Sequence, residues 1–207
     1  MVLVQKMTTK PATIITVKDF GQHFNDRLMT LTAGSDEIIL VFDTYKSDSL
    51  KQKTREKRRQ GKDPVQYQIA DDTSIKHIPM GHFLSHEKTK TDLTVYLAEA
   101  TLKYNANSPK LVITSAAGRT RSNRSMQFDS NNHEEVDTLM ISLAAAASQR
   151  CPEAQLVFFI PDTDVLVLAI AAYEKLCKNA SMTMVSGTVE VGPIWRARAR
   201  GREKAAA

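Results

Sequence analysis

The sequence predicts an α/β protein with a largely parallel sheet. Three observations predict this fold class: short continuous apolar runs, helical segments between them, and aspartates within two residues of the end of two apolar runs. Strands that alternate with helices favour parallel pairing through right-handed crossovers. In such sheets, ligands bind beyond the carboxyl ends of the strands. We therefore expect a functional site where those aspartates lie.

The predicted strands are short apolar runs, which suit the buried strands of a parallel sheet. They span residues 38–42, 110–114, 156–160 and 182–187. Between the second and third of these runs, we expect a polar, basic loop that extends to about Asn132.

The predicted helices follow from apolar residues that recur at helical spacing. They span residues 17–31, 92–104, 134–148 and 165–176. The basic segment after the first strand has few helix-breaking residues and is predicted to be helical as far as Gly61. Residues 61–87 mix glycine, proline and three histidines, and we predict no regular structure for them.

The length of 207 residues suits one domain with a sizeable core, which we place at residues 1–190, followed by a basic tail at 191–207. No apolar run reaches membrane-spanning length, and the N-terminus lacks the form of a signal peptide. The two cysteines have no metal-binding spacing. These features predict an intracellular protein, nuclear or cytoplasmic, with no membrane partner.

Positive charge is concentrated in three segments of the chain. Lysine and arginine outnumber aspartate and glutamate by 28 to 23, for a formal net charge of +5. The basic residues cluster in 51–62, 119–124 and 196–204, whereas acidic residues occur in pairs beside apolar segments. Basic clusters combined with paired acids suit a polyanionic substrate and a metal-assisted reaction on it.

Three acidic groups fall at the expected edge of the sheet. They are Asp43 after the first strand, Glu135 and Asp137 at a helix start, and Asp162 with Asp164 after the third strand. Carboxylates are the ligands that magnesium-class ions prefer, and two such ions acting together lie ~4 Å apart. Each group alone also suits a helix cap or first turn. Together they indicate a cation, because gathering like charges without one costs stability.

Other sequence motifs give weaker indications of function than the acidic groups. The sequence has no P-loop, no GxSxG elbow and no GxGxxG after a strand. The D-x-D at 162–164 also occurs in some sugar-nucleotide transferases. His77, His82 and His86 have a spacing that could hold a metal, with solvated loop histidines as the alternative.

The run 41-VFDTYKSDSLKQKTREKRR-59 resembles the VFDG…LK…R motif of flap-endonuclease-like 5′ nucleases, in the PIN-like nuclease superfamily. The resemblance implies that Asp43 is a metal ligand. It also implies that Lys51 and Arg58 contact the scissile phosphate. Arg55 lies between them on the same predicted helix face.

Two further motifs extend the resemblance over nearly the whole chain. The segment 133-HEEVDT-138 is similar to the family's GEAEA segment through Glu135 and Asp137, and Asp162 with Asp164 match its D-x-D. The strings NNHEEVDTLM and PDTDVLVLA look like those of uncharacterised animal PIN-like proteins with a SHEEADT-type motif. The resemblance implies a three-layer α/β/α sandwich with a mainly parallel central sheet. Relative to that family, we expect the chain to lack the first strand and the C-terminal helical region.

The resemblance implies a metal-dependent nuclease that hydrolyses phosphodiester bonds of DNA or RNA. One or two Mg²⁺ or Mn²⁺ ions would be held by Asp43, Glu135, Asp137, Asp162 and Asp164. Nucleic acid would be contacted by Lys51, Arg55, Arg58, Arg119 and Arg121. The expected lack of the first strand removes one further family ligand. The alternative is therefore a catalytically inactive nucleic-acid-binding or protein-interaction module with the same fold.

Overall fold

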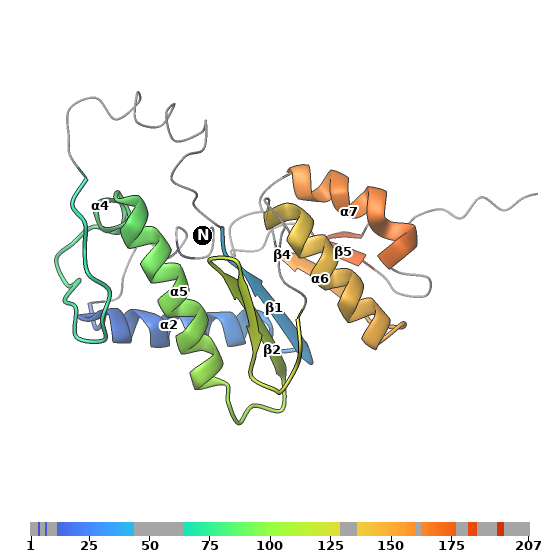
Figure 1. Cartoon of the computed structure of the whole chain (residues 1–207), viewed down its shortest axis with the longest axis horizontal. Coiled ribbons are helices and arrows are strands. Elements are labelled where there is room, and N and C mark those ends of the chain that lie inside the picture. Colours follow the sequence, from blue (N-terminus) through green and yellow to red (C-terminus); the bar gives the residue numbers. More distant parts are fainter. Residues whose placement is uncertain are drawn as a thin grey trace, which may run out of the picture. The chain divides into compact units, whose positions relative to one another are not determined.

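Two three-stranded sheets and their helices make up the described parts of this computed structural model (Figure 1). Described are residues 4, 7, 12–43, 64–128, 136–159, 163–176, 182–185 and 194–196, the last two ranges by backbone alone. The chain divides into two compact units, Leu3–Val136 and Asp137–Ala207. Because each unit combines helices with a sheet, the predicted combination of helices and strands is confirmed. The prediction of a largely parallel sheet is confirmed only in part, since each sheet has one parallel and one antiparallel strand pair.

The first unit contains the sheet with strand order β1-β2-β3. β1 (Glu37–Val41) is parallel to β2 (Leu111–Ala116), and β2 is antiparallel to β3 (Arg119–Ser122). β1 and β2 match the strands predicted at 38–42 and 110–114. The connection from β1 to β2 is long and contains helices, as a parallel pair requires.

Helix α2 (Val17–Leu31) begins at a capping box. The Thr16 N–H donates to the Asp19 carboxylate at 2.9 Å, and the Asp19 N–H donates to the Thr16 hydroxyl at 3.2 Å. The backbone hydrogen bond from Thr16 is the largest cause that lowers the pKa of Asp19, because it favours the ionised carboxylate. The predicted apolar face is confirmed, and its most buried members are Val17, Phe20, Phe24 and Leu28.

Helix α5 (Glu87–Tyr104) begins earlier than predicted, at residue 87 rather than 92. His86 caps it, since its Nδ1 accepts a hydrogen bond from the Lys88 N–H at 3.1 Å. Histidine is not among the usual N-cap residues, so the sequence carried no recognised start signal here. Leu93 and Leu97 are fully buried in the core that also contains the apolar face of α2.

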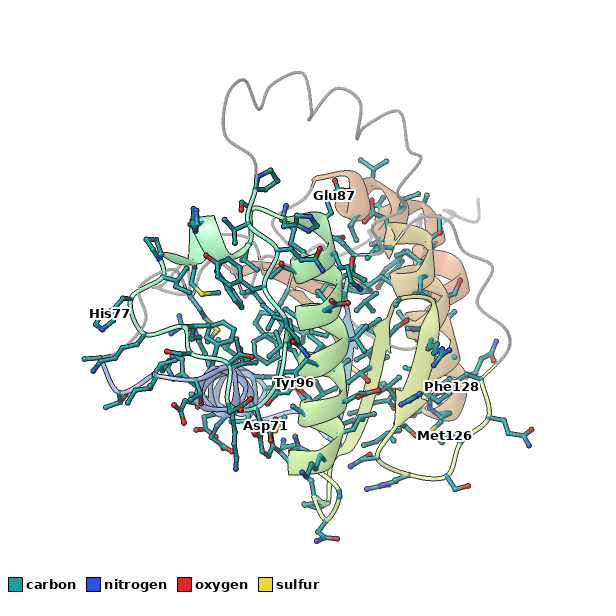
Figure 2. The ribbon with its side chains drawn as sticks, turned by 60° about the vertical axis from the view of Figure 1, so that its left-hand side comes forward. Asp71, His77, Glu87, Tyr96, Met126 and Phe128 are labelled. Atoms are coloured by element: carbon teal, nitrogen blue, oxygen red, sulfur yellow. The ribbon has the colours of Figure 1, made fainter. Side chains whose placement is uncertain are left out.

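The segment 64–86, for which no structure was predicted, includes one short helix, α4 (Met80–Phe83). Tyr96 of α5 holds an earlier part of this segment, because its hydroxyl donates to Asp71 Oδ1 at 2.7 Å. Figure 2 shows the two residues beside each other. Burial, followed by the hydrogen bond to Asp71, raises the pKa of Tyr96 well above its ordinary value.

The prediction of a polar loop after β2 was wrong for its first part, which forms a hairpin with β3. Ala116 pairs with Arg119, and the two residues between them, Ala117 and Gly118, have φ angles of +48° and +74°. Two positive φ angles in a two-residue loop are typical of a type I′ turn, which matches the twist of the strands. Alanine at the first position is unusual there, so the turn signal was weak.

The second unit contains the sheet with strand order β4-β5-β6. β4 (Leu156–Phe159) is parallel to β5 (Met182–Val185), and β5 is antiparallel to β6 (Ile194–Arg196). Helices α6 (Val136–Arg150) and α7 (Thr163–Leu176) match two predicted helices and share a core. Its most buried members are Ala144, Phe158, Val165, Ala169 and Leu176. β6 lies within the segment predicted as a basic tail.

The side-chain amide of Asn123 closes the base of the β2–β3 hairpin. Its Nδ2 donates to the carbonyl oxygens of Asn105 and Lys110, at 2.8 and 3.0 Å, and its Oδ1 accepts from the Val112 N–H at 2.9 Å. Asn105 ends α5 and donates to the Asn25 side chain of α2 at 2.7 Å. One chain of hydrogen bonds therefore joins two helices to the hairpin.

In the part of the chain that the structure describes, no helix is both long enough and apolar enough to cross a membrane.

Replacing Asn123 with alanine is expected to lower the free energy of unfolding by about 1–3 kcal/mol, because three backbone groups lose their partner. Urea denaturation measures this change. Asn107→Ala, at an exposed position of the loop before β2, is the control and is expected to change stability by less than about 0.5 kcal/mol. Equal stability of the two variants would contradict the role given to Asn123.

Replacing Tyr96 with phenylalanine is expected to flatten the loss of stability at alkaline pH. Because the pKa of Tyr96 is raised, the folded chain keeps a proton that the unfolded chain loses near pH ~10. The stability that this difference in pKa contributes is fully present below about pH 10, and it is lost as the pH rises through the pKa of the folded chain. Thermal unfolding between about pH 8 and 11 measures it.

The control for this measurement is Tyr104→Phe. Burial raises the pKa of Tyr104 as well, so this variant should also flatten the alkaline decline. Only Tyr96→Phe is expected to lower the free energy of unfolding by about 1 kcal/mol at neutral pH, because it removes the hydrogen bond to Asp71. A Tyr96→Phe variant with the wild-type pH profile would refute the assignment.

Candidate functional site

Asp43 lies two residues beyond the carboxyl end of β1, at the edge where the sequence predicted it. The preceding residue, Phe42, donates its N–H to Ser115 O at 2.9 Å, and its ring centroid lies 6.1 Å from that of Phe24. These contacts fix the backbone from which the exposed side chain of Asp43 extends. In α/β proteins, the carboxyl end of a parallel strand is where ligands bind.

The other predicted metal ligands belong to the second half of the chain. Asp137 is partly buried in the first turn of α6, where the helix dipole favours a negative charge. Asp164 is the second residue of α7, the helix that follows β4. Glu135 and Asp162 lie outside the described residues.

Two of the predicted nucleic-acid contacts lie on β3 rather than in a loop. Arg119 and Arg121 are two residues apart on this strand, so their side chains extend from the same face of the sheet. Both side chains are exposed. Lys51, Arg55 and Arg58 lie outside the described residues.

A groove of about 290 Å³ lies between α5 and the β2–β3 hairpin; we call it the α5–hairpin groove. Its helix side consists of Val95, Ala98, Glu99 and Leu102. Its hairpin side combines Thr114, Ala116 and the turn residue Ala117 with Arg119 and Arg121. The buried members are small, whereas the charged members are exposed. The groove therefore has a mainly apolar floor and a charged rim.

The rim of the groove has an excess of positive charge. Arg121 Nη1 lies 3.1 Å from Glu99 Oε1, and the side chains of this ion pair are 52% and 58% exposed. Arg119 has no ion-pair partner among the described residues. Two guanidinium groups against one carboxylate favour an anionic ligand.

The described residues contain no group of three or more histidine, cysteine, aspartate or glutamate side chains that could hold a metal ion. This description covers Asp43 and Asp137 in full but only the backbone of Asp164. Two of the three histidines that the sequence singled out have structural partners. His82 Nδ1 lies 3.1 Å from the Tyr67 hydroxyl, and His86 caps α5.

A scan against models of protein families finds no match to this chain, and searches of curated proteins and of solved structures also find none.

The groove itself was not predicted from the sequence, and neither were the roles of Glu99 and Thr114. Glu99 lies in α5, at least fifteen positions before the hairpin residues of the groove. Thr114 lies on β2, and the turn that was not recognised separates it from Arg119 and Arg121. The glycine at position 118, between two segments of strand-like composition, was the available signal for that turn.

The coupling between Arg121 and Glu99 is expected to contribute less than about 1 kcal/mol, because both side chains are exposed. A double-mutant cycle of Arg121→Ala and Glu99→Ala, read by urea denaturation, measures it. The exposed pair Lys88–Asp92, at 3.4 Å within α5, is the comparison. A coupling of several kcal/mol would mean that Arg121 is held by Glu99 and is not available to a ligand.

Proposed function

We propose that this chain is a metal-dependent nuclease of PIN-like fold that hydrolyses phosphodiester bonds of DNA or RNA. The observation that carries the proposal is the position of the acidic residues. Asp43 follows β1 and the D-x-D of Asp162 and Asp164 follows β4, and each of these strands is paired in parallel with a neighbour. Ligands bind at such strand ends.

The three-layer sandwich remains part of this proposal. Its support is local: each unit has one parallel strand pair, and the connection between the paired strands contains a helix. Parallel pairs joined in this way are the building units of layered α/β folds.

The predicted ligand set fits a magnesium-class ion in its chemistry, since all five donors are carboxylates: Asp43, Glu135, Asp137, Asp162 and Asp164. When bound, such ions activate a water molecule and stabilise charge on the phosphate. The role of the chain itself is to supply the carboxylates that hold the ions.

The basic residues would bind the substrate. Lys51 and Arg58 would orient the scissile phosphate and offset its negative charge in the transition state, as positioned cations do in phosphoryl chemistry. Arg55, Arg119 and Arg121 would contact the nucleic-acid backbone. Such contacts give affinity that decreases as the salt concentration rises.

The position of Asp137 favours a second candidate function. A carboxylate in the first turn of α6 stabilises the helix without any metal. If the other acids act in the same way, the chain is a catalytically inactive module that binds nucleic acid or another protein.

The test is cleavage of labelled single-stranded and duplex oligonucleotides in the presence of Mn²⁺, with Asp43→Asn and Asp164→Asn as variants. Losing an outer-shell partner of a metal ligand already costs about 10–100-fold. Each variant removes a ligand itself, so its cleavage activity should decrease by about 100-fold or more. Asp72→Asn, the same change at an exposed residue of a turn, is the control and should keep full activity.

Thermal unfolding with Mn²⁺ separates the two candidate functions. At an ion concentration of ~100 Kd, bound metal should stabilise the chain by about 2.7 kcal/mol, and both variants should reduce this gain. Oligonucleotide binding without Mn²⁺ stabilisation or cleavage would favour the inactive module. Full cleavage by both variants would refute the proposed ligands.

A further inference from the structure

The α5–hairpin groove lies entirely within the first unit, and all of its lining residues are described. The proposed function uses only the two arginines of its rim. Its volume of about 290 Å³ is near the lower end of the ~300–1,000 Å³ typical of small-molecule sites. The groove therefore suits a small ligand or one unit of a larger ligand.

The floor of the groove consists of small side chains. Ala98 and Ala116 are 5% and 8% exposed, and their short side chains leave room between α5 and the hairpin. Thr114 adds one hydroxyl to the lining of the floor. A hydroxyl can both donate and accept, so it can serve a polar ring edge.

The rim supplies the complementary charge for a phosphate. The Cα atoms of Arg119 and Arg121 are about 6.8 Å apart along β3, at the usual rise of an antiparallel strand. A guanidinium group binds phosphate through parallel N–H bonds, and its plane also stacks on a base. Arg119 is the stronger candidate for the phosphate, because Arg121 already pairs with Glu99.

We infer that the α5–hairpin groove binds an unpaired nucleotide, with the base against Ala98 and Ala116 and the phosphate on Arg119. A base held in a duplex is stacked on both faces and cannot enter the groove. An acidic peptide would also satisfy the arginines. The nucleotide is favoured because a guanidinium plane can stack on an unstacked base as well as bind its phosphate, whereas the carboxylates of a peptide offer no ring to stack.

The nucleotide can come from two sources, a unit of a single strand or a free nucleoside phosphate. The single strand as source rests on the proposed function, whereas the affinity of the groove for a nucleotide does not. The two sources differ in the number of contacts outside the groove, so their affinities distinguish them.

The experiment is a titration of the full chain with AMP, with an eight-residue oligoadenylate and with the matching duplex, followed by amide NMR in EDTA. Amide signals of 95–102 and 114–121 are expected to shift with AMP and with the single strand. Arg119→Glu should weaken both interactions about tenfold. Lys103→Glu, the same charge reversal at an exposed position of α5 outside the groove, should not.

Ala116→Leu, which fills the groove, should weaken single-strand binding and leave duplex binding unchanged. Ala116→Leu can also disturb the core, in which Ala116 is buried. The Arg119→Glu variant changes an exposed residue and therefore tests the inference separately. Tighter binding of oligoadenylate than of AMP identifies the strand as source, and equal binding identifies the free nucleotide.

Unchanged amide signals would overturn the inference, as would equal effects of Arg119→Glu and Lys103→Glu. A synthetic acidic peptide that shifts the same signals while AMP and the oligonucleotide do not would also overturn it. Since EDTA prevents metal-dependent cleavage, these results do not depend on whether the chain is a nuclease.

Discussion

The Asn123 side chain makes the interaction on which the arrangement of the first unit depends. One amide satisfies two carbonyl oxygens and one N–H in the region where α5 ends and β2 begins. Through Asn105 the same network reaches Asn25 of α2 in a buried position. A buried polar network of this kind rigidifies a fold only when its members are satisfied, and these amides find partners in one another and in the backbone.

The network also supports one side of the groove. The hairpin carries both arginines, and the amide at its base holds it beside the end of α5. Lys110 strengthens the same corner, because its ammonium group donates to the carbonyl oxygens of Thr32, Ala33 and Ser35 after α2. The groove is therefore supported by polar contacts at one end and by the apolar core at the other.

Much of the fold could be predicted because its signals are local. Apolar periodicity located α2, and continuous apolar runs located β1, β2 and β4 to within one or two residues. The start of α5 was missed because histidine replaces a usual cap residue, and β3 was missed because its turn begins with alanine. In both places the backbone adopts a regular structure through residues that are rarely used for it.

The candidate site, like the fold, could be predicted from the sequence only in part. The position of Asp43 could be predicted, since an apolar run followed by a carboxylate is a local pattern. The groove could not, because it joins α5 to a hairpin through pairs such as Glu99 and Arg121 that are distant in the sequence. The sequence did single out both arginines as cationic, but only the strand shows that they share one face.

Asn123 is also the first residue of the sequence pattern Asn-Arg-Ser, which is an acceptor pattern for N-linked glycans. A glycan is attached to Nδ2, the atom that donates both hydrogens to the carbonyl oxygens of Asn105 and Lys110. Attachment would remove one of these donors and place a sugar in the corner between α5 and the hairpin. Glycosylation at this position would therefore weaken the hydrogen bonds that close the hairpin.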